Sequence, residues 1–141
     1  MIDVQFTAEQ YEEMNGFMKM IENDFSNMAP VYAERMLLSP STTESVTKRI
    51  KSDFASTNAQ VGILSLRNFI NYTMNESTKL QNLNYKLHLL NSNVIPTNIQ
   101  GLERNCKNSF EVYEVKASSH YPMIENPVEF NKQLEKIIGE I

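Results

Sequence analysis

A stripe of apolar side chains at alternating steps of three and four residues runs through the first thirty residues. It constrains the fold more than any other feature of the chain. A β-strand cannot keep one face apolar at this spacing, whereas an α-helix that packs against other helices can. The stripe therefore predicts a mainly α protein and says little about function. Its members are Tyr11, Met14, Met18, Ile21, Phe25 and Met28.

The rest of the chain predicts further helices. No proline occurs from residue 41 to residue 95, and apolar residues continue at helical spacing there, so we expect two long helices, 42–74 and 77–91, or a single continuous one. A last helix starts after Asn126, which is followed by proline at the first helical position. These patterns predict a bundle of four to six helices in a single domain spanning residues 1–141.

Capping patterns place the helix starts. A Ser or Thr followed three residues later by Gln or Glu is typical of a capping box, in which each side chain accepts a hydrogen bond from a backbone N–H of the other residue. The first helix should run to about Asn27, and Pro30 should kink or restart the chain. The three capping pairs are Thr7 with Gln10, Ser41 with Glu44 and Thr97 with Gln100.

Two segments favour strands over helices. Residues 2–6 alternate between apolar and polar side chains, and residues 109–117 are rich in strand-forming residues. A minor two-stranded β ribbon formed by these segments is therefore compatible with the helical bundle, provided that a helix covers it.

Charge is distributed unevenly along a chain whose net charge is only −4. The first third is acidic and residues 48–90 are basic, which is expected when an acidic helix lies beside a basic one. The functional interpretation is a basic helix face, formed by Lys48, Arg49 and Lys51, that docks on an acidic partner. Tyr121, in a predicted loop, is a candidate aromatic anchor for a partner. The mild net charge gives no reason to expect nucleic acid as a partner.

Residues for chemistry are sparse. The four glycines are isolated, so no glycine-rich phosphate-binding loop can form. Cys106, His88 and His120 are the only sulfur or imidazole ligands, and none has metal-ligand spacing to another. Helical spacing from Ile99 and Leu102 predicts that Cys106 is buried. We therefore expect no catalytic residue, no metal and no cofactor; the enzymatic alternative pairs Cys106 with His120 or His88.

The chain shows neither a signal peptide nor an apolar run long enough to span a membrane, and its single cysteine allows no intrachain disulfide. A cytoplasmic location with no membrane partner is the expectation. Abundant Asn, Lys and Ile fit an AT-rich genome, such as those of many Firmicutes and their phages, and the cytoplasm would then be that of a host cell.

The leading functional hypothesis is a non-enzymatic helical protein that binds another protein and forms a homo-oligomer. The first-helix stripe would then be the oligomer seam, since such a stripe also suits self-association. A concrete version is a phage or mobile-element accessory protein that inhibits a host or defence complex. One alternative is a virion-assembly or scaffold component. Another is a small-ligand or nucleotide-binding protein, with anions held between helices by Arg49, Lys51, Arg67 or Arg104.

Overall fold

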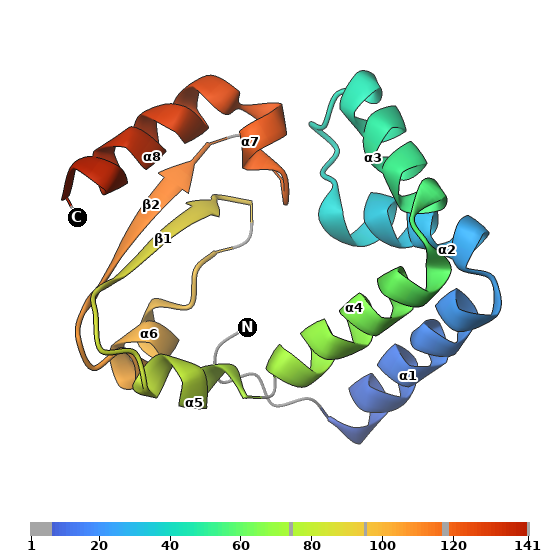
Figure 1. The fold of residues 1–141 in the computed structure, drawn as a ribbon, viewed down its shortest axis with the longest axis horizontal. Helices are drawn as coiled ribbons and strands as arrows, with labels where there is room; N and C mark the ends of the chain where they lie inside the picture. The colour runs from blue at the N-terminus through green and yellow to red at the C-terminus, as the bar shows by residue number, and fades with distance from the viewer. Residues whose placement is uncertain (1–6, 74, 95, 117–118, 141) are drawn as a thin grey trace.

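Helices make up most of the chain, and one small parallel sheet completes the fold (Figure 1). The computed structural model describes residues 7–73, 75–94, 96–116 and 119–140. Within these residues the main contacts between elements fall into two groups, one from each half of the chain. The mainly α prediction is thus confirmed, but the four to six helices expected are too few, because the described residues form eight α-helices and one π-helix. No helix among the described residues is long and apolar enough to cross a membrane.

The first group is entirely helical. It comprises α1 (Ala8–Asn23), α2 (Phe25–Tyr32), the π-helix η1 (Ala33–Leu37), α3 (Glu44–Ser56) and α4 (Ala59–Thr73). The second group contains the sheet. It comprises α5 (Glu76–Gln81), β1 (Leu87–Ser92), α6 (Ile99–Asn105), β2 (Phe110–Val115), α7 (Pro122–Glu125) and α8 (Pro127–Glu140).

The core of the first group forms where α1 and α2 meet α3 and α4. Ile21, Phe25 and Ala29 are buried at its centre. Partly buried apolar side chains surround them, because four helices present one apolar stripe each to the same volume. These surrounding residues are Phe17, Met28, Tyr32, Phe54, Ile63 and Leu66. The predicted stripe therefore packs inside the chain over much of its length.

The start of α1 agrees with the sequence, but its end does not. Thr7 and Gln10 form the expected capping box, with hydrogen bonds of 2.9 and 3.2 Å. The helix ends before Asp24, whose carboxylate accepts hydrogen bonds from the Asn27 amide. The predicted continuation to Asn27 is wrong because the chain restarts at Asp24. Pro30 lies inside α2, and the π-helix η1 begins directly after the end of α2.

The long helices expected over 42–74 and 77–91 are broken into shorter ones. α3 ends at Ser56, and the hydroxyl of its C-cap Thr57 donates a hydrogen bond to the Asp53 carbonyl at 2.8 Å. Asn58 caps the next helix by accepting a hydrogen bond from the Val61 N–H at 3.2 Å. The side chains of Thr57 and Asn58 thus bond the local backbone, so that one helix ends and another starts without any proline or glycine. The expected box of Ser41 and Glu44 does not form, because the N-cap of α3 is Thr43, whose side chain makes no cap bond.

The predicted ribbon is also corrected. β2 lies within the expected segment 109–117, but its partner is β1, which pairs with it in parallel from Leu87 opposite Phe110 to Ser92 opposite Val115. Residues 2–6 lie outside the described residues. The leucines of β1 fit a helical spacing, yet Asn82 ends α5 and the chain leaves the helix before reaching them. Parallel pairing requires a crossover, which α6 provides.

Helix α8 covers one face of the sheet (Figure 1). Tyr113 and Val115 of β2 and Ile137 of α8 are buried. The start of α8 agrees with the prediction, since the Asn126 side chain accepts a hydrogen bond from the Glu129 N–H. The start of α6 is shifted by one residue, because Asn98 and not Thr97 caps it.

Candidate functional site

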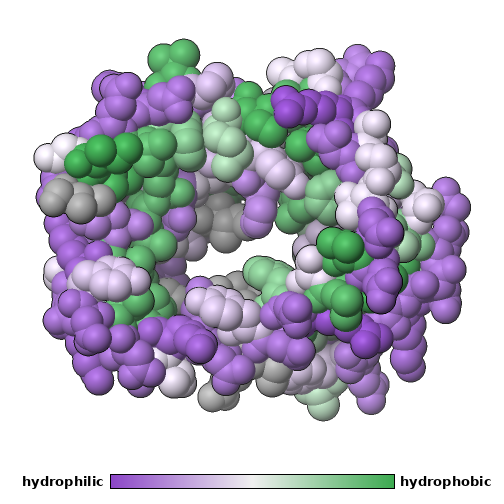
Figure 2. Space-filling view, in the orientation of Figure 1, coloured by the Kyte–Doolittle hydropathy of each residue, from purple (hydrophilic) through white to green (hydrophobic). Residues whose placement is uncertain are grey.

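A groove of about 680 Å³ lies between the two groups of elements. Figure 2 shows the molecule hollowed at its centre, with apolar atoms on the walls. Eleven of the lining residues are apolar and come from η1, α4, β1, α7, α8 and the loops next to them. They are Met36, Leu37, Leu38, Phe69, Leu89, Leu90, Val94, Pro96, Pro122, Met123 and Phe130. We call this feature the central groove.

Large apolar side chains of the central groove are strongly exposed. The exposed fractions are 60% for Met36, 52% for Phe69, 48% for Val94 and 47% for Met123. Covering such side chains with another apolar surface is favourable by roughly 25 cal/mol for each Å² removed from water. A single exposed apolar residue needs no explanation, but several around one concavity indicate a site of interaction.

The polar part of the groove carries little charge. Glu76 and His120 are its only ionisable side chains, and the lining contains neither Lys nor Arg. Amide and hydroxyl groups supply the remaining polarity; for example, the Asn91 side chain donates to the Thr97 hydroxyl at 2.8 Å. The groove is therefore suited to an apolar, uncharged surface and not to an anion.

A cluster of polar contacts joins the two groups on one side of the groove. One Glu125 carboxylate oxygen accepts a hydrogen bond from the Thr42 hydroxyl at 2.5 Å, and the other accepts from the backbone N–H and hydroxyl of Ser119 at 2.5 and 2.7 Å. The His120 N–H donates to the Leu37 carbonyl at 3.2 Å. We call these five residues the clasp. Since Ser119 is only 6% exposed, its donors depend on the Glu125 carboxylate.

A second hollow, of about 440 Å³, lies at the junction of α4 and α5. Four of its seven lining residues are asparagines, so it offers hydrogen-bonding groups. Its lining residues are Asn68, Asn71, Tyr72, Asn75, Thr78, Lys79 and Asn82.

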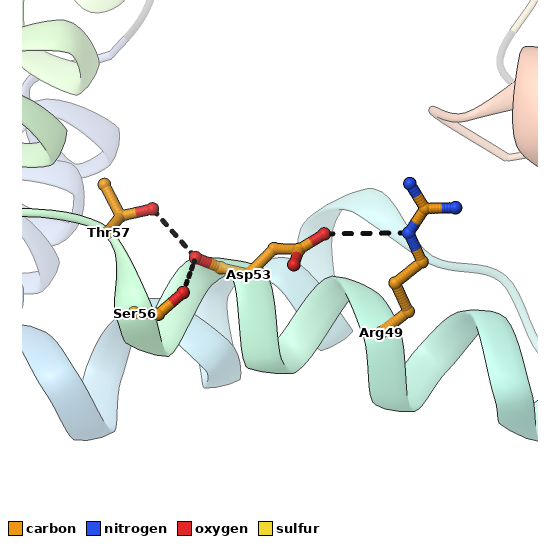
Figure 3. Close-up of polar contacts among 4 residues, drawn as sticks. All are labelled: Arg49, Asp53, Ser56 and Thr57. Carbon is orange, nitrogen blue, oxygen red and sulfur yellow. Dashed lines mark hydrogen bonds and ion pairs between the residues drawn. The ribbon is translucent and has the colours of Figure 1, made fainter.

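The predicted basic face lies on α3 and makes ion pairs within the chain. Lys48 Nζ is 2.6 Å from Glu44, and Lys51 Nζ is 2.6 Å from Glu34. Arg49 Nε lies 3.8 Å from the Asp53 carboxylate (Figure 3). The backbone carbonyl of Asp53 accepts hydrogen bonds from the hydroxyls of Ser56 and Thr57 at the end of α3. These residues line neither hollow. Docking of an acidic partner on this face stays a prediction.

Tyr121 is not a fully exposed anchor. It precedes α7 and is partly buried, and burial raises the pKa of its hydroxyl, with Tyr32 and Asp53 close enough to contribute. The side chain thus lies between α7 and the first group. Its two neighbours in the sequence, His120 and Pro122, line the central groove. Its role as a partner contact stays a prediction.

The six residues of the predicted oligomer seam divide into two sets. Met18, Ile21 and Phe25 are buried within the chain, with exposed fractions of 7%, 1% and 9%. Tyr11, Met14 and Met28 are partly exposed. Helices of the same chain therefore use the centre of the stripe, and Met28 packs against the same core. Self-association through Tyr11 and Met14 stays a prediction.

The remaining candidate residues do not converge on one site. Burial raises the pKa of the Cys106 thiol, which lowers the fraction of reactive thiolate. Cys106 is the C-cap of α6, and the apolar packing expected of its helix is only partly correct, because Leu102 is buried while Ile99 is 43% exposed. Arg67, a predicted anion ligand, lies 2.6 Å from Glu22 instead.

No protein-family model matches the chain, and neither the curated proteins nor the solved structures include one that is similar to it. The site must therefore be interpreted from its own residues. Sequence reasoning missed the central groove, because its lining comes from segments far apart in the chain. The available signal was apolar residues within predicted loops, such as Val94 and Met123.

Proposed function

We propose that this protein is a non-enzymatic binding protein that holds an apolar, uncharged segment of another protein in the central groove. The observation that carries the proposal is the set of strongly exposed apolar side chains on the groove walls, including Met36, Phe69 and Met123. The near absence of charge supports an uncharged segment, because an ionic group buried there would lack a partner.

A protein segment fits the groove better than a small molecule does. The volume of about 680 Å³ lies in the range of ligand pockets, but those pockets usually enclose most of their ligand. Figure 2 shows the groove open through the molecule, so a small molecule would stay largely in water whereas a chain can continue beyond it. The hypothesis that the partner belongs to a host or defence complex, which the protein inhibits, belongs to the same proposal.

Site-specific photocrosslinking in native cells tests the proposal. A photoreactive phenylalanine analogue would replace Phe69 or Met123 in the groove, and Val128 in the control. Val128 is 80% exposed on α8 and does not line the groove. We expect the two groove positions to capture the same protein and the control position to capture none. Equal capture from Val128 would contradict the proposal.

The captured partner then allows a quantitative test. A carboxylate in the groove would lose its hydration without gaining a partner when an apolar segment covers it. Phe69→Asp should therefore weaken binding at least tenfold, since losing one buried aromatic anchor by itself typically costs about 2 kcal/mol or more. Val128→Asp is the matched control and should leave the dissociation constant unchanged. The alternative is an apolar small molecule in the same groove. Such a ligand should raise the melting temperature of the protein and compete with the captured partner, and a failure to do either would count against this alternative.

A further inference from the structure

Three metal-ligating side chains meet where β1, β2 and α8 come together, away from the central groove lining. His88, Glu111 and Glu140 each offer one ligand atom, and these atoms all lie within 4.8 Å of one another. The register of the sheet brings two of the three side chains together, because His88 and Glu111 are directly opposite in the parallel pair and share a face. Glu140 reaches the same place from the last turn of α8.

The imidazole of His88 has an unusual environment. Its Nδ1 atom is the one buried side-chain nitrogen or oxygen in the described part of the chain that has no hydrogen-bond partner. The ring stacks on Tyr113, with centroids 6.2 Å apart and planes inclined by 16°. A buried polar atom normally finds a partner, and a bound ion is one of the recognised explanations when it does not.

A tyrosine orients one of the two carboxylates, and a lysine occupies the other as a competing cation. The Tyr113 hydroxyl donates a hydrogen bond to Glu140, and burial together with both carboxylates raises the pKa of Tyr113, so the proton stays on the phenol. Lys86 Nζ lies 2.6 Å from Glu111 and lowers the pKa of that carboxyl, which is therefore ionised at neutral pH. Lys136 lies 5.1 Å from the centre of the Tyr113 ring. A ligand oriented by a hydrogen-bonded neighbour, as Glu140 is by Tyr113, is typical of metal centres.

We propose that His88, Glu111 and Glu140 bind one divalent transition-metal ion of the Zn²⁺ class. One imidazole and two carboxylates form a mixed set of nitrogen and oxygen donors. Such a set suits Zn²⁺ better than it suits Mg²⁺ or Ca²⁺, which prefer ligand sets made of oxygen atoms alone. Bonds of roughly 2.0–2.2 Å would draw the ligand atoms closer together, and the exposed Glu140 can move to allow it. The ion would take over the position of the Lys86 ammonium beside Glu111. It would also tie the end of α8 to the sheet.

Titration of the full chain with ZnCl₂, followed by calorimetry and by thermal denaturation, tests the site. We expect saturable binding of one ion with an increase in melting temperature, and no comparable effect of MgCl₂. Glu140→Gln should weaken Zn²⁺ binding at least tenfold. This variant should fold, because Glu140 is exposed at the end of a helix. Glu135→Gln is the matched control, since Glu135 is an exposed acid on the same helix, and it should bind as the natural chain does.

A second variant separates a metal site from a purely structural cluster. Lys86→Gln removes the competing ammonium, so it should tighten Zn²⁺ binding about tenfold, whereas a cluster that needs Lys86 for its structure would bind the ion less well. Absence of saturable binding, equal affinity of Glu140→Gln and the natural chain, or weaker binding by Lys86→Gln would each overturn the proposal. His120→Gln and Cys106→Ser should leave the affinity unchanged; loss of binding in either would place the ion elsewhere and overturn it too.

Discussion

Single residues decide how closely the helices of the first group approach. Gly62 on α4 lies against the ring of Phe25, and a Cβ atom built at Gly62 would come within 2.3 Å of Phe25 Cζ and 2.5 Å of Cε2. Real Cβ atoms do not make such contacts, so the ring would have to move. Since Phe25 belongs to the buried core, its movement would disturb the packing around it.

Gly62→Ala should therefore destabilise the protein, although alanine favours helix. Overpacking of this kind costs about 1–3 kcal/mol, which exceeds the gain of roughly 1 kcal/mol in helix propensity. Gly16→Ala is the matched control, because nothing lies within 4 Å of the Cβ position in the middle of α1. It should stabilise the protein by about 0.5–1 kcal/mol. Urea denaturation compares the two, and an equal gain in both variants would show that Phe25 does not pack against Gly62.

At the scale of elements, the sequence predicts helices well where a pattern is local. The capping box of Thr7 and Gln10 and the start of α8 after Asn126 are confirmed because both depend on a few neighbouring residues. The strand β1 could not be predicted in this way. Its leucines fit both periods, and only its pairing with β2, which is distant in the sequence, decides between them.

The same distinction explains the sites. Spacing along the chain gave no reason to join His88 with Glu111 and Glu140, because parallel pairing and the packing of α8 create that cluster. The central groove likewise depends on how the two groups lie together. The basic face of α3 was visible in the sequence, whereas its partners on other elements, such as Glu34 for Lys51, were not.

The break between α3 and α4 allows a test at this scale. Asn58→Ala removes the side chain that accepts the Val61 N–H, so it should lower the free energy of unfolding by about 1 kcal/mol. Gln60→Ala, at an exposed position in the first turn of α4, is the control and should have little effect. Chemical denaturation measures both. A neutral Asn58→Ala would mean that the two helices are positioned by tertiary packing alone.

At the scale of the whole molecule, the clasp is the main polar connection between the two groups. We expect one cooperative unfolding transition for the natural chain, consistent with the proposal of a single domain over residues 1–141. Glu125→Ala removes the acceptor of Thr42 and Ser119 and leaves the buried Ser119 donors unpaired. This should cost about 1–3 kcal/mol and uncouple the groups, so that two transitions replace one.

Thermal denaturation followed by circular dichroism detects this change, and small-angle scattering should show a larger radius of gyration for Glu125→Ala. Glu135→Ala, an exposed substitution on α8, is the control and should keep one transition and the natural dimensions. A single transition at unchanged dimensions in Glu125→Ala would show that the groups are held together by other contacts.

Because the clasp consists of hydrogen bonds and not of covalent links, it gives the proposed binding a characteristic time course. A segment enclosed by the groove could leave sideways only while Glu125 is separated from Thr42 and His120 from Leu37. Both entry and release would then wait for the same opening event, so the two rate constants would be slow together, and weakening the clasp would accelerate exchange more than it changes affinity. Residence time would in that case depend in part on Glu125 and Thr42, neither of which lines the groove.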